Sequence, residues 1–239
     1  MRLRFRHREA LLDNSFQALS SSLSATVGIA ITSVTGRPIA FGTWLSGAAW
    51  STSKVPLAIA ALRAGVGSHD LVALTIAQSD NLAAEKLWSQ LGNTVDAAQQ
   101  VQAVIREAGD AATMVESRRL RAGYTAFGQT RWSLADQARF AAGLAHLPDA
   151  SPVVDLLGSL CVEHRWGLAA KGFAAKGGWG PGLGDDYLVR QFGIVSTAWG
   201  TVGIALAAEV REGEYEAGVD VVNSLTDWLV GRLPALTEQ

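Results

Sequence analysis

This sequence has one cysteine, a small net charge and no long apolar run. Each of these features excludes a structural element or a class of protein. Cys161 is the one cysteine, so no disulfide can form within the chain. It lies in an apolar run of helical spacing that starts at Val153, where we expect it to fill a small space in the core. The 20 basic and 22 acidic residues leave a net charge of −2, which provides no basic surface for a nucleic acid. No run approaches the ~20 apolar residues that cross a bilayer.

The composition is instead that of one globular domain. Of the 239 residues, 49% are hydrophobic and 18% charged, which is ample for a packed core, and we expect a monomer. The first eight residues, MRLRFRHR, resemble the charged start of an export signal, but an amphipathic pattern without an apolar core follows them. We interpret this stretch as the solvated start of a helix, and the sequence leaves the compartment open.

Apolar spacing predicts helices at both ends of the chain and through its middle. Residues 8–22 and 215–233 each place an apolar stripe on one helical face, and Pro234 is expected to end the second helix. From residue 55 to about 161 the pattern is helical almost throughout. Ser133 and Ser151 are expected N-caps within this region.

Strand patterns flank the helical middle on both sides. Residues 27–34 and 37–44, joined by Thr35-Gly36, predict a β-hairpin. Residues 187–196 and 201–210 predict two more strands, the last with strict alternation. Because two strands alone are marginally stable in water, we expect the strands from both ends of the chain to share one sheet.

A serine and a lysine three positions apart begin the helical region. Residues three apart are neighbours on one helix face, so the amine of Lys54 can reach the hydroxyl of Ser51. A neutral amine there accepts the serine proton and makes the serine a nucleophile, provided that burial lowers the pKa of the lysine. A serine cap beside a surface lysine would give the same four-residue pattern.

Two further elements strengthen the nucleophile hypothesis when they are taken together with the first. Ser79-Asp80-Asn81 separates two helical runs, so its side chains can point into a cleft. Lys176-Gly177-Gly178-Trp179 lies on an expected strand beside the glycine-rich residues 180–184. Each element alone is more typical of a turn or a cap, but their order along the chain points to one site.

The three elements resemble the S-x-x-K, S-D-N and K-T-G motifs of the class A β-lactamases and the penicillin-binding serine acyltransferases. The resemblance extends to LTIAQSDNLAA over residues 74–84 and, in the order of elements, to essentially the whole chain. It implies an α/β (α+β) fold in which an antiparallel five-stranded sheet is flanked by N- and C-terminal helices. Residues 1–50 and 170–239 would form this α/β part, and residues 51–169 an all-helical insert.

The resemblance also implies a role for each matching residue. Ser51 would attack a β-lactam or related amide carbonyl and form an acyl-enzyme, with Lys54 as proton acceptor. Ser79 would relay a proton to the departing nitrogen. Lys176 would raise the positive potential over the substrate. Asn81, Gly178 and Trp179 would bind substrate, with the N–H groups of Ser51 and Trp179 as the oxyanion hole.

Departures from the family pattern leave the reaction open between alternatives. Gly177 stands where the family has a hydroxyl residue, and only 28 positions separate Ser51 from Ser79. The deacylating glutamate of class A enzymes is replaced by Ser117 or Arg119, with Glu116 as the nearest carboxylate. A DD-peptidase, or a catalytically weak relative that binds β-lactam or peptidoglycan, therefore remains an alternative to a β-lactamase-like hydrolase.

No cofactor or metal is expected from the remaining residues. His7, His69 and His146 have no metal-ligand spacing with any cysteine or glutamate and are expected to be exposed. His164 is expected to be a packing or loop residue. The family resemblance implies a small-molecule or peptide substrate and a secreted or cell-envelope location, although no signal peptide is visible in this chain.

Overall fold

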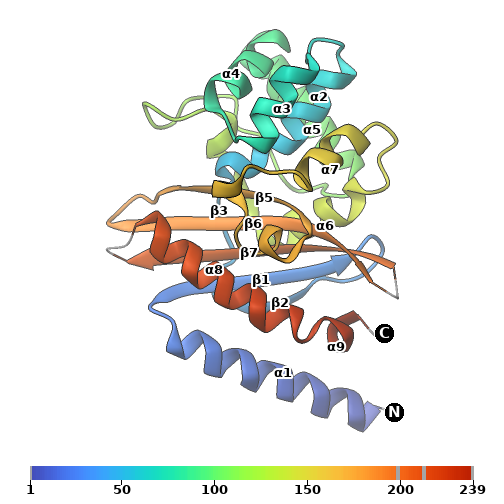
Figure 1. Ribbon diagram of the computed structural model, residues 1–239, viewed down its shortest axis with the longest axis vertical. Helices are drawn as coiled ribbons and strands as arrows, with labels where there is room; N and C mark the ends of the chain where they lie inside the picture. The colour runs from blue at the N-terminus through green and yellow to red at the C-terminus, as the bar shows by residue number, and fades with distance from the viewer. Residues whose placement is uncertain (1, 198–199, 212–213, 238–239) are drawn as a thin grey trace.

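The computed structural model describes residues 2–197, 200–211 and 214–237. Its centre is a five-stranded antiparallel sheet in the order β2-β1-β7-β6-β5, which confirms the predicted sheet (Figure 1). The strands are β1 (Ala25–Ser33), β2 (Ile39–Gly42), β5 (Ala174–Pro181), β6 (Asp186–Thr197) and β7 (Gly200–Arg211). β1 pairs with β7 from Ala25↔Val210 to Ser33↔Val202, so both ends of the chain contribute to one sheet.

Helices from the two ends of the chain cover one face of the sheet (Figure 1). They are α1 (Arg2–Ser22), α8 (Tyr215–Val230) and α9 (Leu233–Thr237). Phe16, Phe41 and Trp228 join α1, the sheet and α8, with ring centroids 5.1 to 5.5 Å apart. α8 ends before Gly231, so the prediction that Pro234 ends it is wrong. Pro234 lies in the first turn of α9, where a helix does not need its N–H.

The other face carries α6 (Leu134–Leu144) and, beyond it, the helical region (Figure 1). That region contains α2 (Lys54–Arg63), α3 (His69–Ala77), α4 (Asn81–Gln90), α5 (Thr94–Glu107) and α7 (Ser151–Leu157). It is mainly rather than entirely helical, because the short strand β4 (Arg131–Ser133) pairs with β3 (Ser46–Ala48). Local periodicity missed this pair because its strands are too short to show alternation.

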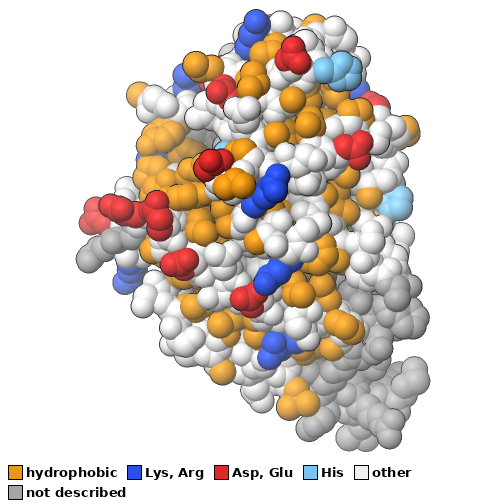
Figure 2. All heavy atoms as spheres, viewed as in Figure 1, with side chains coloured by type: hydrophobic (Ala, Val, Ile, Leu, Met, Phe, Trp, Pro, Cys, Tyr) orange, Lys and Arg blue, Asp and Glu red, His pale blue; other side chains and the backbone are white. Residues whose placement is uncertain are grey.

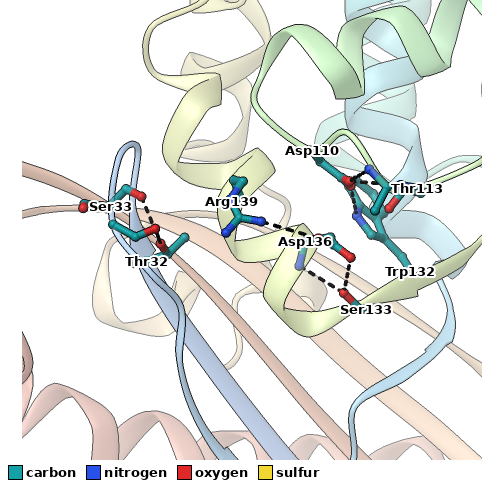
Figure 3. A network of polar contacts seen from close by, with 10 residues as sticks. Thr32, Ser33, Asp110, Thr113, Trp132, Ser133, Asp136 and Arg139 are labelled. Carbon is teal, nitrogen blue, oxygen red and sulfur yellow. Dashed lines mark hydrogen bonds and ion pairs between the residues drawn. The ribbon is translucent and has the colours of Figure 1, made fainter.

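A loop without regular helix follows α5, where the sequence pattern predicted helix. Asp110 is fully buried and anchors the start of this loop. Its carboxylate accepts from the N–H groups of Ala112 and Thr113 at 3.0 Å, and from Nε1 of Trp132 at 2.8 Å (Figure 3). An aspartate that bonds the backbone two and three residues onward favours a turn over a helix.

The predicted N-caps had different outcomes. The hydroxyl of Ser133 accepts from the N–H of Asp136 at 3.0 Å, which confirms it as the N-cap of α6 (Figure 3). The prediction for Ser151 is wrong, because Ala150 is the N-cap of α7 and Ser151 is already helical. Among the described residues, no helix has both the length and the apolar character that a membrane crossing requires.

Candidate active site

Ser51 lies in a short 3-10 helix, η1 (Trp50–Ser53), that leads directly into α2. The hydroxyl groups of Thr52 and Ser53 each donate to a carbonyl three residues back, at 2.5 and 2.7 Å, and so close the turn. Trp50 has a φ of 48°, a conformation that costs energy for a bulky residue. The turn leaves the Ser51 side chain half-buried at the edge of a pocket.

A buried arginine on β6 positions the chain that enters this turn. Nη1 of Arg190 donates to the carbonyls of Gly47 and Ala48 at 3.1 and 3.0 Å. Its Nη2 donates to Oε1 of Gln137 at 2.8 Å, and Nε2 of Gln137 donates to Oγ1 of Thr52 at 2.9 Å. Burial lowers the pKa of Arg190 to about 9. Carbonyl and amide groups therefore solvate the guanidinium of Arg190, which links the sheet to the turn that contains Ser51.

The amine of Lys54 is buried next to the S-D-N loop. Nζ donates to the carbonyl and, at 3.2 Å, to the hydroxyl of Ser79, and to Oδ1 of Asn81 at 2.7 Å. Burial lowers the pKa of Lys54 to about 7, and the charge of Asp80 opposes this shift. In the described part of the chain the amine makes no hydrogen bond to Ser51, although both residues line the same pocket. The amine is thus poised between its charged and neutral forms near neutral pH.

Ser79 lies between two lysine amines. Nζ of Lys176 donates to Oγ of Ser79 at 2.8 Å and to the carbonyl of Gly177 at 2.9 Å. Burial, and secondly the nearby charge of Lys54, hold the pKa of Lys176 well below its ordinary value. Ser79 has a φ of 53°, and Asp80 caps α4 by accepting from the N–H of Ala83 at 2.7 Å. The loop thus directs the Ser79 hydroxyl at both amines.

Strand β5 lies directly against η1. A Cβ at Gly178 would be 2.8 Å from the backbone nitrogen of Ser51 and 2.9 Å from that of Thr52, so only glycine allows this approach. β5 is an edge strand paired with β6, and every second N–H of an edge strand faces away from the sheet. The ring of Trp179 lines the pocket and packs against His164 and Tyr215.

The pocket that contains Ser51 has a volume of about 670 Å³. It brings together Ser51, Lys54, Ser79, Asn81 and Trp179 from the set that the sequence predicted. Its wall is rich in aromatic and apolar side chains that the motifs do not include, namely Trp50, Leu82, Tyr124, Phe127, Pro181 and Tyr187. Figure 2 shows hydrophobic side chains gathered on the left of the molecule, where the helical region meets the sheet.

The glycine at position 177, where the resembling motif has a hydroxyl residue, has a steric explanation. A Cβ at Gly177 would lie 2.5 Å from Cζ2 and 2.8 Å from Cη2 of Trp166. The Trp166 ring is buried and packs at 6.3 Å from the ring of Trp179. An indole ring therefore occupies the direction in which a threonine side chain would project.

The carboxylate that lines the pocket belongs to Glu85, whereas the sequence had pointed to Glu116 as the nearest carboxylate. Glu116 bonds Arg118 at 3.0 Å and is absent from the pocket lining, as is Ser117. Arg119 does line the pocket, and it pairs with Glu85 of α4 at 3.0 Å. Glu85 belongs to none of the three motifs, although its spacing of four from Asn81 places both residues on one helix face.

Cys161, His69, His146 and His164 are absent from the pocket lining. Cys161 follows α7 instead of belonging to it and is only partly buried, so the core-filler prediction is wrong. Its Sγ lies 3.1 Å from Nδ1 of His164. Burial raises the pKa of the Cys161 thiol, so the reactive thiolate is disfavoured. His69 and His146 are exposed as predicted, and the side chain of His7 lies outside the described structure. Across the described ranges, His, Cys, Asp and Glu form no group suited to a metal ion.

Solved structures of class A β-lactamases share this fold over nearly their whole length. A class A β-lactamase representative from Bacteroides cellulosilyticus matches with a TM-score of 0.76 at 13% identity, covering 95% of this chain and 99% of that chain. A β-lactamase from Chitinophaga pinensis matches at 0.72 and 15% identity, covering 92% and 99%. One from Sphaerobacter thermophilus matches at 0.66 and 19% identity, covering 92% and 95%.

No protein-family model matches this sequence, and no curated protein matches it. The structural likeness confirms the predicted β-lactamase-like fold. Because the identities are below 20%, the likeness is to the fold alone. A shared fold does not establish a shared reaction, which depends on the side chains in the pocket.

Proposed function

We propose that this protein is a serine hydrolase that forms an acyl-enzyme on Ser51 with β-lactams or related amides. The observation that carries the proposal is the amine of Lys54, which is buried beside Ser51 and has a pKa lowered to about 7. An amine with a pKa near the working pH is an effective general base. Its neutral form accepts the proton of Ser51, directly or through one water, as the hydroxyl attacks the carbonyl.

The two amines around Ser79 support the last step of acylation, in which the amide nitrogen leaves. Collapse of the tetrahedral intermediate breaks the carbon–nitrogen bond, and the departing nitrogen needs a proton. Ser79 Oγ accepts hydrogen bonds from Nζ of both Lys54 and Lys176, so it can pass a proton on while regaining one from a lysine. In its protonated form Lys176 would also add positive potential near the substrate.

The close approach of β5 to η1 supports an oxyanion hole. The backbone nitrogen of Ser51 lies next to Gly178, and Trp179 follows Gly178 in the chain. The N–H groups of Ser51 and Trp179 would stabilise the developing oxyanion there. Each such donor is worth about 3 to 4 kcal/mol of transition-state stabilisation in proteases. Asn81 orients the amine of Lys54 by accepting its hydrogen bond. The Asn81 side chain would also bind the substrate amide.

A penicillin-binding role with a long-lived acyl-enzyme is the second candidate. It is favoured by the position of Glu116, whose carboxylate bonds Arg118 outside the pocket lining. Slow release of product distinguishes this candidate from a β-lactamase. Steady-state hydrolysis of nitrocefin separates the two, because only the hydrolase turns over many equivalents per enzyme.

Intact-protein mass spectrometry after mixing with benzylpenicillin tests the acyl-enzyme. We expect a covalent adduct on Ser51 in the wild type and no adduct in Ser51→Ala. Ser89 is exposed near the end of α4 and is absent from the pocket lining. Ser89→Ala is therefore the matched control and should behave as the wild type. An adduct that persists in Ser51→Ala, or a wild type that neither carries an adduct with benzylpenicillin nor hydrolyses nitrocefin, would contradict the proposal.

A further inference from the structure

Hydrolysis of an acyl-enzyme requires a base that removes a proton from the attacking water. Among the described residues that line the pocket with Ser51, Glu85 alone carries a carboxylate. The histidine nearest the pocket, His164, is absent from the lining. The carboxylate available for deacylation, the hydrolysis of the acyl-enzyme, therefore lies on α4 and not in the loop that contains Glu116.

The geometry of α4 directs Glu85 towards the reacting groups. Asn81 and Glu85 are one turn apart on the same face, about 6 Å along the helix axis. That face is turned to the site, because Oδ1 of Asn81 accepts from Nζ of Lys54 at 2.7 Å. Helical side chains lean towards the N-terminus of their helix, so the Glu85 side chain leans towards Asn81 and the Lys54 amine.

Arg119 holds this carboxylate through an ion pair. Nη2 of Arg119 lies 3.0 Å from Oε1 of Glu85, and both residues line the pocket. The Glu85 side chain is 28% exposed and that of Arg119 58%, so water reaches the pair. An ion pair through one oxygen leaves the second oxygen of Glu85 able to accept from a water molecule.

We propose that Glu85 is the general base of deacylation in this protein, held in place by Arg119. The inference rests on the acyl-enzyme of the proposed function. The Glu85 carboxylate takes a proton from water as the water oxygen attacks the ester carbonyl carbon on Ser51. The tetrahedral intermediate then breaks its bond to Oγ of Ser51, the proton returns to Oγ, and the carboxylic acid product leaves.

The test compares Glu85→Gln with Glu116→Gln as the matched control. Each protein is mixed with benzylpenicillin, and the Ser51 adduct is followed by mass spectrometry as it forms and as it disappears. We expect Glu85→Gln to form the adduct within about 3-fold of the wild-type rate and to lose it about 10²- to 10⁴-fold more slowly, the range for a lost general base. Glu116→Gln should match the wild type in both steps.

The readouts separate a catalytic role from a structural one. Adduct formation at the normal rate in Glu85→Gln reports an intact site, and Glu85→Asp, which keeps the carboxylate, should recover part of the loss. Hydroxylamine, a nucleophile that needs no base, should release the adduct from Glu85→Gln. If the Glu85→Gln adduct is hydrolysed at the wild-type rate, or if the wild-type adduct is never hydrolysed, the role of Glu85 is wrong while the acyl-enzyme stands. If neither the wild type nor Glu85→Gln ever carries an adduct and the wild type does not hydrolyse nitrocefin, both proposals are overturned.

Discussion

The indole ring of Trp166 fills the space into which a side chain at Gly177 would project, with a Cβ at position 177 only 2.5 Å from Cζ2 of the ring. Trp166 comes from the loop before β5, and Gly177 from the strand itself. The two residues therefore depend on each other, because a larger side chain at position 177 needs the space that the Trp166 ring occupies.

This dependence predicts a coupled effect on stability. Gly177→Thr should lower the free energy of unfolding by about 1 to 3 kcal/mol, as overpacking does. In a Trp166→Ala background the same substitution should cost at least about 1 kcal/mol less, because the ring is gone. Urea unfolding of the four proteins of the cycle measures the coupling. Additive effects of the two substitutions would contradict the steric explanation.

The lowered pKa of Lys54 predicts how the acylation rate depends on pH. Below a pKa of about 7 the amine holds a proton and cannot accept another from Ser51. The rate of adduct formation should thus rise nearly tenfold per pH unit up to about pH 6.5 and level off above about pH 7.5. Single-turnover measurements across that range give the profile. A rate that is flat from about pH 5 to 8 would show that Lys54 is not the base.

The same group links stability to pH. The pKa of Lys54 falls from 10.5 to about 7 because the amine is buried in the folded chain. Between these values the unfolded chain holds a proton that the folded chain has released, so raising the pH favours folding. From about pH 7 to 9 the stability of the wild type relative to Lys54→Met should rise by at most about 3 kcal/mol. Denaturant unfolding at both pH values measures this difference, and a constant difference would argue against a neutral amine.

Gly178 offers a backbone test of the site. A methyl group at this position would press on the backbone nitrogens of Ser51 and Thr52 and push β5 away from η1. A displacement of about 1 Å near the reacting atoms can cost about 10²-fold in rate, so we expect a loss of this order in acylation by Gly178→Ala. Gly231→Ala is the control, because its Cβ would have no contact closer than 3.5 Å. Equal acylation rates in the two variants would contradict the close approach.

Features that depend on neighbours in the sequence were predicted well. The alternation over residues 201–210 predicted β7, and the break between two helical runs predicted the loop at Ser79. The sequence left Lys54 open between a surface lysine and a buried base, and the structure shows that it is buried. Where local signals were short or ambiguous, as at β3, β4 and Ser151, the prediction failed.

The sequence by itself determined which chemical groups this protein carries and which local elements hold them, because helical and strand periods act over a few residues. Only the tertiary structure decided which groups meet. Arg190 reaches the chain that leads into the Ser51 turn from β6, Trp166 excludes a side chain at Gly177, and Arg119 pairs with Glu85 in the pocket lining. Each of these contacts joins residues of different elements, and their choice of partner depends on the packing of the whole fold, which no local period encodes.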